Sequence, residues 1–150
     1  MNTKLFTRSI SQLTKQIYLH PSYKISFGKA ENSLAIGSFA TPDLTREAFV
    51  PNPQFLPKLN QLIGERVHED FTFIMEASVN ANSFMPIYDL RDVPRYGRIP
   101  EIDSVFGYLQ VSDKGEMLKG TYQNNDMYQL YNSTGLIMLS DFLLEEVRKL

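Results

Sequence analysis

Apolar residues recur at helical spacing in the first twenty residues of the chain. At about 100° per residue they fall within one narrow arc, and basic residues occupy the arc opposite. The apolar arc holds Phe6, Ile10, Leu13 and Ile17, and the basic arc holds Lys4, Arg8 and Lys15. This pattern predicts an amphipathic helix that ends at Pro21, because a proline ring disrupts the preceding turn and removes a hydrogen-bond donor.

A second stretch with helical periodicity runs from residue 52 to residue 68. Asn52 is a favourable cap, and Pro53 suits the first helical position, where its missing N–H would have no partner. The apolar positions that follow share one face and are Phe55, Leu56, Leu59, Leu62, Ile63 and Val67. We predict a helix that packs this face on the core and ends near His68.

Shorter apolar runs predict strands. Residues 22–39 contain two of them around a turn at residues 28–33, which is typical of a hairpin. Phe71–Val79 and Phe84–Leu90 are aromatic-rich runs on either side of a turn. Pro86 requires the second of these strands to lie at an edge or at a bulge, because proline cannot donate to a strand ladder.

The last third of the chain predicts two more hairpins and a helix. Val105–Val111 and Met117–Tyr122 flank a turn that contains Gly115. A smaller pair of strands flanks residues 132–135. Ser140 then caps a final helix with apolar residues on its inner face.

Strands grouped between two helices predict an α+β fold. We expect an antiparallel meander sheet with two amphipathic helices packed on it, preceded by a basic amphipathic N-terminal leader. Residues 1–24 are assigned to the leader and residues 25–150 to a single α+β domain. The 150-residue length suits one domain with one core.

The charge distribution separates these two parts. The first thirty residues contain five cations and no acid, for a net charge of +5; because the whole chain carries −2, residues 31–150 carry −7. A basic, hydroxyl-rich, acid-free amphipathic segment is typical of a transit peptide and predicts a mitochondrial matrix location. Two alternatives remain for this segment: a surface helix packed on the domain, and a helix that lies in a membrane interface.

Composition excludes several kinds of site. The chain has no cysteine and only two histidines, which removes disulfides, thiolate catalysis and cysteine- or histidine-rich metal centres. Glycine spacing matches neither a dinucleotide fingerprint nor a P-loop. We therefore predict no cofactor. The acidic domain argues against nucleic acid as a partner, and no stretch is long and apolar enough to predict a transmembrane segment.

The segment from Asp89 to Asp103 is the candidate functional loop. Arginines alternate in it with acids around two prolines and a glycine, and tyrosines lie in and beside it. Arginine forks bind carboxylate or phosphate groups, and tyrosine rings can stack on a planar ligand. The candidate binding residues are Arg91, Arg95, Arg98, Tyr88, Tyr96 and Asp89. The structural alternative is that these arginines and acids pair with one another and pin the loop onto the domain.

Two functional hypotheses follow. In the first, the chain is a non-catalytic mitochondrial accessory or assembly protein that acts through protein–protein contacts, because no catalytic constellation is evident and aromatic residues are abundant enough to form an interface. In the second, it is a small-ligand-binding or enzymatic module that recognises an anionic metabolite through Arg91, Arg95 and Arg98, with Asp89 acting on the ligand.

Overall fold

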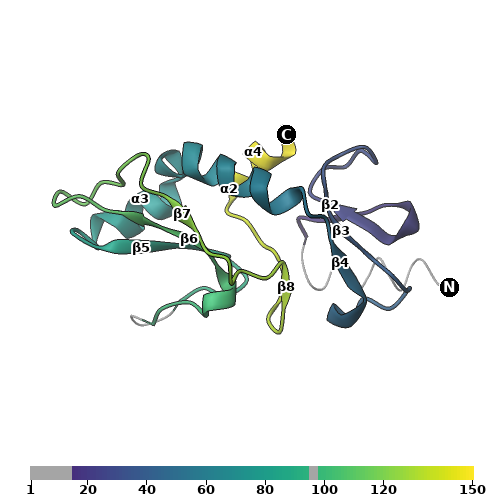
Figure 1. Cartoon of the computed structure of the whole chain (residues 1–150). Coiled ribbons are helices and arrows are strands. Elements are labelled where there is room, and N and C mark those ends of the chain that lie inside the picture. Colours follow the sequence, from purple (N-terminus) through teal and green to yellow (C-terminus); the bar gives the residue numbers. More distant parts are fainter. Residues whose placement is uncertain (1–14, 95–97) are drawn as a thin grey trace.

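The computed structural model describes residues 15–94 and 98–150. Its first sheet has four antiparallel strands that neighbour one another in chain order: β1 (Tyr18–Leu19), β2 (Lys24–Ser26), β3 (Ala35–Phe39) and β4 (Phe49–Pro51). The pairing of β2 with β3 confirms the predicted hairpin in residues 22–39. This sheet lies at the right of Figure 1.

The second sheet consists of β5 (Phe84–Tyr88), β6 (Val105–Gln110) and β7 (Gln123–Asn124), in that order and antiparallel. β5 is an edge strand, as Pro86 requires. A two-stranded sheet of β8 (Tyr131–Asn132) and β9 (Gly135–Leu136) lies between the two larger sheets (Figure 1). A small hairpin is therefore present where it was predicted, but residues 132 and 135, which were expected in the turn, belong to its two short strands.

The described residues form three α-helices beside these sheets: α2 (Phe55–Arg66), α3 (Phe71–Ser78) and α4 (Asp141–Arg148). Single turns of 3-10 helix lie at η1 (Pro21–Tyr23), η2 (Arg46–Ala48), η3 (Val67–Glu69) and η4 (Ile102–Ser104). α2 runs along the top of the molecule in Figure 1, with α4 beside it. Antiparallel sheets combined with these helices confirm the α+β class, although the strands form three sheets instead of one meander.

One element was assigned the wrong type. Phe71–Val79 was predicted as a strand, but residues 71–78 form the helix α3. Asp70 caps this helix, since its side chain accepts a hydrogen bond from the Thr72 N–H at 3.0 Å. Phe73 and Ala77, four residues apart, are the buried positions. The β-favouring residues of this run thus follow a helical period, because the cap and tertiary packing outweigh local propensity.

The start of the described chain also differs from expectation. The N-terminal helix was predicted to continue to Pro21, but Tyr18–Leu19 form strand β1 and pair with residues 25–26. Ile17 is buried in the core, and the Gln16 side chain bonds both backbone groups of Leu139. Within the segment assigned to the leader, Ile17 and His20 are therefore buried, and β1 belongs to the first sheet. The prediction for residues 1–14 lies outside the described residues.

The turn around Gly115 is present, but the strand expected after it is not. Gly115 adopts a φ of 79°, and a Cβ there would lie 3.1 Å from the Ser78 Cα, so a larger residue would be strained and crowded against α3. Only a single bridge joins Val111 to Met117. Regular pairing resumes at β7, so the predicted strand Met117–Tyr122 is wrong.

One continuous core joins the elements. Its fully buried side chains come from both large sheets, from α2 and α3 and from β9, and they include Ile25, Ile36, Phe55, Ile63, Phe73, Ile87, Phe106 and Leu136. The predicted cap of the last helix is confirmed, because Ser140 Oγ accepts from the Leu143 N–H. The same hydroxyl donates to the buried Asp70 at 2.5 Å, which ties the start of α4 to the start of α3. In the part of the chain that the structure describes, no helix combines the length and apolar character needed to cross a bilayer.

Candidate functional site

Asp89 directly follows β5 and is completely buried. Its carboxylate accepts hydrogen bonds from the Tyr128 hydroxyl at 2.6 Å, from the Met138 N–H at 2.8 Å and from the Arg91 N–H at 3.0 Å. Arg91 Nε lies 3.3 Å from the same carboxylate and forms an ion pair with it. Tyr128 and Met138 are 39 and 49 residues away from Asp89 in the chain, so the carboxylate connects distant segments in the interior.

The Arg91 guanidinium is equally enclosed, with only 4% of the side chain exposed. It lies over the Tyr128 ring, 5.1 Å from the ring centre. Its nitrogens also donate to backbone carbonyl oxygens, which are those of Leu130 and Gly135, both at 2.9 Å, of Asp103 at 3.0 Å and of Gln129. Since a guanidinium has five N–H donors, this set of acceptors occupies it inside the fold.

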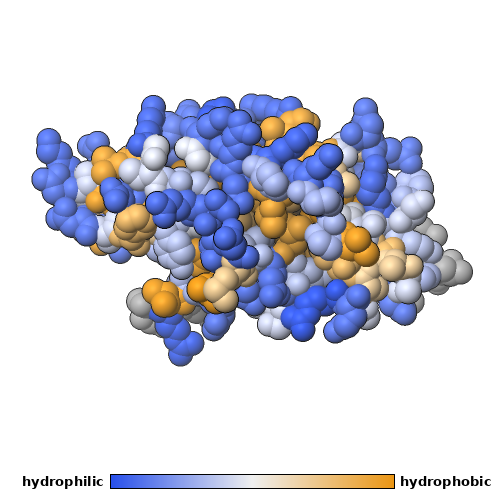
Figure 2. All heavy atoms as spheres, viewed as in Figure 1, coloured by the Kyte–Doolittle hydropathy of each residue, from blue (hydrophilic) through white to orange (hydrophobic). Residues whose placement is uncertain are grey.

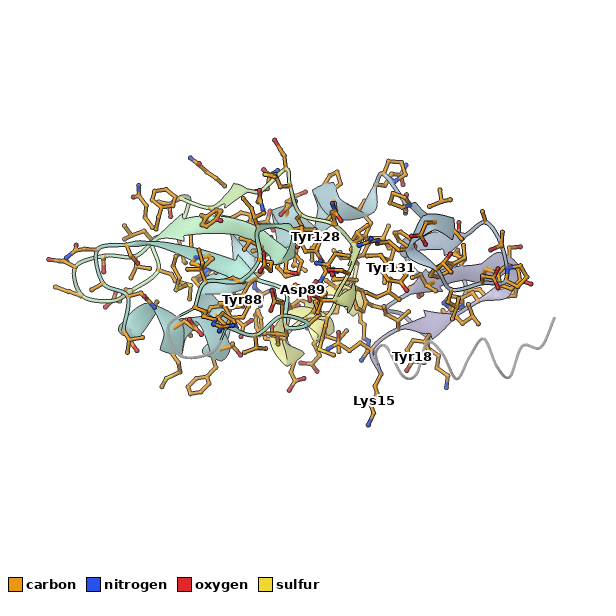
Figure 3. All side chains as sticks on the ribbon, turned by 90° about the horizontal axis from the view of Figure 1, so that it is seen from below. Lys15, Tyr18, Tyr88, Asp89, Tyr128 and Tyr131 are labelled. Atoms are coloured by element: carbon orange, nitrogen blue, oxygen red, sulfur yellow. The ribbon has the colours of Figure 1, made fainter. Side chains whose placement is uncertain are left out.

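Burial governs the ionisation of this cluster. It raises the pKa of the Asp89 carboxyl to about 6, although the Arg91 charge and the Tyr128 hydroxyl both lower it. Burial and the adjacent Asp89 charge hold the pKa of Tyr128 well above its usual value. Tyr128 therefore remains a hydrogen-bond donor at neutral pH. Figure 3 shows Asp89 and Tyr128 in the middle of the molecule, between the two larger sheets.

The other predicted site residues do not converge with Arg91. Tyr88 is buried, its ring centre lies 5.3 Å from that of Phe73, and its hydroxyl donates to Glu76 at 2.8 Å. Arg98 is exposed. Arg95 and Tyr96 lie outside the described residues. Asp89 and Arg91 thus follow the ion-pairing alternative, and anion recognition by the remainder of the loop stays a prediction.

A different feature is a candidate for recognition. The outward face of α3 carries four large apolar side chains, which we call the α3 stripe. Their exposed fractions are 72% for Phe71, 40% for Ile74, 54% for Met75 and 81% for Val79, which follows the last turn. Phe71, Met75 and Val79 are spaced four residues apart on the face opposite the buried positions Phe73 and Ala77, and Ile74 lies at the edge of this face. α3 is therefore apolar on both its core side and its solvent side.

The charges near the α3 stripe have partners within the domain. Glu76, the single charged residue of α3, accepts the Tyr88 hydrogen bond. Glu69, just before α3, pairs with Arg66, which also contacts Glu146 at 2.9 Å. α3 has no lysine or arginine. The stripe offers apolar contact area and no reactive group.

The sequence contained a signal for α3 that the alternation of aromatic residues concealed. Asp70 stands immediately before the apolar run, at the place where a cap would stand, and the 3.6-residue period buries Phe73 and Ala77. No such signal exists for the partners of Arg91. Apart from the Asp89 carboxylate, most of its acceptors are main-chain carbonyls of Asp103 and of residues 129–135, and any residue type could supply them.

The described residues contain no group of three or more histidine, aspartate and glutamate side chains placed to hold a metal ion. No protein-family model, no curated protein and no solved structure matches this chain. Functional inference therefore rests on the chain's own geometry.

Proposed function

We propose that this chain is a non-catalytic accessory protein of the mitochondrial matrix that acts through protein–protein contacts, with the α3 stripe as its contact surface. The observation that carries the proposal is the exposure of Phe71, Met75 and Val79 on one face of a short, well-capped helix. Contiguous apolar patches of this kind on a folded protein mark interaction sites, and large aromatic and Met side chains are enriched in interfaces.

The chemistry around the stripe favours a protein over a lipid surface. Helices that lie on membranes carry lysine and arginine on their polar face, which attract anionic headgroups. α3 has neither, and its one charge is the acid Glu76. Residues 31–150 as a whole carry −7. An anionic membrane would therefore repel the body of this protein.

The dimensions of α3 favour a different protein over a second copy. Eight helical residues extend about 12 Å. A symmetric contact between two such helices would cover much less than the roughly 800 Å² per partner typical of a stable complex. A partner with a groove or a longer helix can cover the stripe together with its polar rim, and it can also reach β5, whose outer edge is unpaired within the described sheet.

Photo-crosslinking tests the contact surface in mitochondria. A photoreactive phenylalanine analogue replaces Phe71 in one variant and Val50, which is 51% exposed on β4, in a control. We expect position 71 to cross-link to one defined protein and position 50 not to do so. With that protein purified, Met75→Ser combined with Val79→Ser should weaken binding at least about tenfold, because apolar anchors dominate interface energies.

Two results would contradict the contact surface. One is the absence of any cross-linked protein at position 71. The other is the same cross-linked products from positions 71 and 50, which would indicate random encounters. Val50→Ser serves as the matched control in the binding measurement, because it removes an equally exposed apolar group from the other end of the molecule.

The matrix location rests on the acid-free basic start of the chain, and import tests it separately. The full chain should enter isolated mitochondria only when the inner membrane is energised, and Lys4→Gln with Arg8→Gln should reduce entry. If a leader is removed, we propose that the cut precedes Gln16, because Gln16 and Ile17 hold the last third of the domain. Import that depends neither on the membrane potential nor on Lys4 and Arg8 would contradict the proposed matrix location.

A further inference from the structure

A groove of about 640 Å³ lies between α2 and the segment that contains β7. One wall is the face of α2 formed by Leu56, Pro57, Asn60, Gln61, Gly64 and Glu65. Tyr122, Asn124, Asn125, Asp126 and Tyr128 form the other wall. In Figure 1, α2 runs above the second sheet, to which β7 belongs. The groove is separate from the α3 stripe, since it contains no residue of α3.

The charged side chains that line the groove are both acids, one on each wall. Glu65 accepts a hydrogen bond from Gln61 at one carboxylate oxygen, at 3.1 Å, and Asp126 accepts one from Asn124 at 3.2 Å. The second oxygen of each carboxylate has no donor, and neither acid is in an ion pair, among the residues that the structure describes. Among residues 15–94 and 98–150, no lysine, arginine or histidine lines the groove.

Aromatic and apolar surface lies between these acids. The Tyr122 hydroxyl donates to Asn60 at 2.7 Å, which fixes its ring against α2. Gly64 leaves this ring uncovered on the helix side, because a Cβ at that position would lie 3.5 Å from the ring and a longer side chain would cover it. Leu56 and Pro57 add apolar surface on the same wall. The groove therefore combines negatively charged hydrogen-bond acceptors with apolar surface.

We propose that this groove binds an organic cation, namely a primary ammonium or guanidinium group on an aliphatic stem. Glu65 and Asp126 supply the opposite charge, and the amide oxygens around them add acceptors. The Tyr122 ring and Leu56 cover the stem, and an aromatic face also attracts a cation. The two carboxylates disfavour an anion, because like charges repel. The same chemistry can come from a free amine metabolite or from a lysine or arginine side chain of a partner.

Titration of the purified full chain distinguishes these sources. The probes are cadaverine as a free diamine, lysine blocked at both ends of its backbone as a protein-like side chain, and pentanediol as a neutral analogue of the diamine. Binding is followed by calorimetry and by amide chemical shifts. We expect saturable binding of a cationic probe in the micromolar to millimolar range, with shifts at Gln61, Glu65 and Asn124, and no binding of pentanediol.

Variants test the assignment to the groove. Glu65→Gln combined with Asp126→Asn should weaken cation binding at least about tenfold. The control pair Glu145→Gln and Asp113→Asn makes the same change in net charge outside the groove and should leave the affinity within about twofold. Gly64→Leu leaves the charge unchanged and fills the groove, so it should also weaken binding at least about tenfold.

The source follows from which cationic probe binds: cadaverine alone assigns the groove to a free amine, and blocked lysine, with or without cadaverine, to a basic side chain. The proposal is overturned if no cationic probe saturates at millimolar concentration, if pentanediol binds equally well, or if both charge pairs weaken binding to the same extent. Because none of these variants touches α3, failure here leaves the contact surface on α3 unaffected.

Discussion

The cluster around Asp89 and the α3 stripe reverse the usual placement of polar and apolar side chains. Asp89 and Arg91 are charged, yet both side chains are enclosed, and the guanidinium is occupied by the chain itself. Phe71 and Val79 are apolar, yet 72% and 81% of their surfaces are exposed. Chemically conspicuous residues serve the interior in the first region, and residues typical of a core face solvent in the second.

The contrast shows which of the two regions can still bind a partner after the chain has folded. A buried ion pair with a complete set of hydrogen bonds has no unpaired donor or acceptor for a ligand. Removal of one member leaves an uncompensated charge. An exposed apolar side chain gains free energy from burial, at about 25 cal/mol per Å² of surface removed from water. Burial of the α3 stripe by a partner would therefore be favourable, whereas the polar groups of the Asp89 cluster already have their partners within the folded chain.

Substitution of Arg91 tests the interior half of this comparison and has the largest expected effect. Arg91→Ala should lower the free energy of unfolding by about 3–5 kcal/mol, because it removes the positive charge that faces the buried Asp89 carboxylate and the guanidinium donors to the Gln129 and Gly135 carbonyl oxygens. Arg98→Ala, in the same loop, removes an exposed arginine and should change stability by less than about 0.5 kcal/mol. Urea unfolding at pH 7 measures both. Equal small effects would show that the Arg91 contacts are dispensable.

The same contrast explains how far the sequence could predict the fold. Segments with a local signal were predicted correctly: the hairpin of β2 and β3, the edge position of Pro86, and the Ser140 cap of α4. Each depends on residues close together in the chain. The strands were expected in one sheet because sequence spacing does not specify that β8 and β9 separate the two larger sheets.

The candidate loop shows where prediction reaches its limit. The sequence identified the arginines and acids of this loop, Asp89 and Arg91 among them, and it left open whether they bind a ligand or pair with one another. The decision depends on Tyr128, Met138 and the carbonyls near residue 130, which reach the loop only after the chain has folded. Main-chain acceptors cannot be predicted from residue types, because every residue has a carbonyl oxygen. The prediction for α3 was wrong for another reason: the alternation of aromatic residues was given more weight than the cap at Asp70.

The pH dependence of stability also tests the buried Asp89 cluster, and its expected effect is smaller than that of Arg91→Ala. Because burial raises the pKa of Asp89 to about 6, the folded protein holds this proton at a pH where the unfolded chain has released it. The stability that the proton confers is complete below the unfolded pKa and is lost as the pH rises through about 6. Asp89→Asn cannot titrate. The free energy of unfolding of the wild type minus that of Asp89→Asn should therefore fall by about 2 kcal/mol between about pH 4 and pH 7.

Urea unfolding of both proteins across this pH range provides the measurement, and the difference between them cancels other titrating groups. A difference that rises with pH would contradict the direction of the Asp89 shift and would mean that the Arg91 charge outweighs burial.

The smallest expected effect concerns the exterior half, and α3 contains its own control. Phe71→Ala removes a ring that is 72% exposed and should change the free energy of unfolding by less than about 0.5 kcal/mol. Phe73→Ala makes the same chemical change two residues later, where the ring is 1% exposed, and should cost about 3–4 kcal/mol. Thermal and urea unfolding compare the two variants at equal helix propensity. A large loss of stability in Phe71→Ala would mean that Phe71 packs within the domain, and the α3 stripe would then no longer be a surface available to a partner.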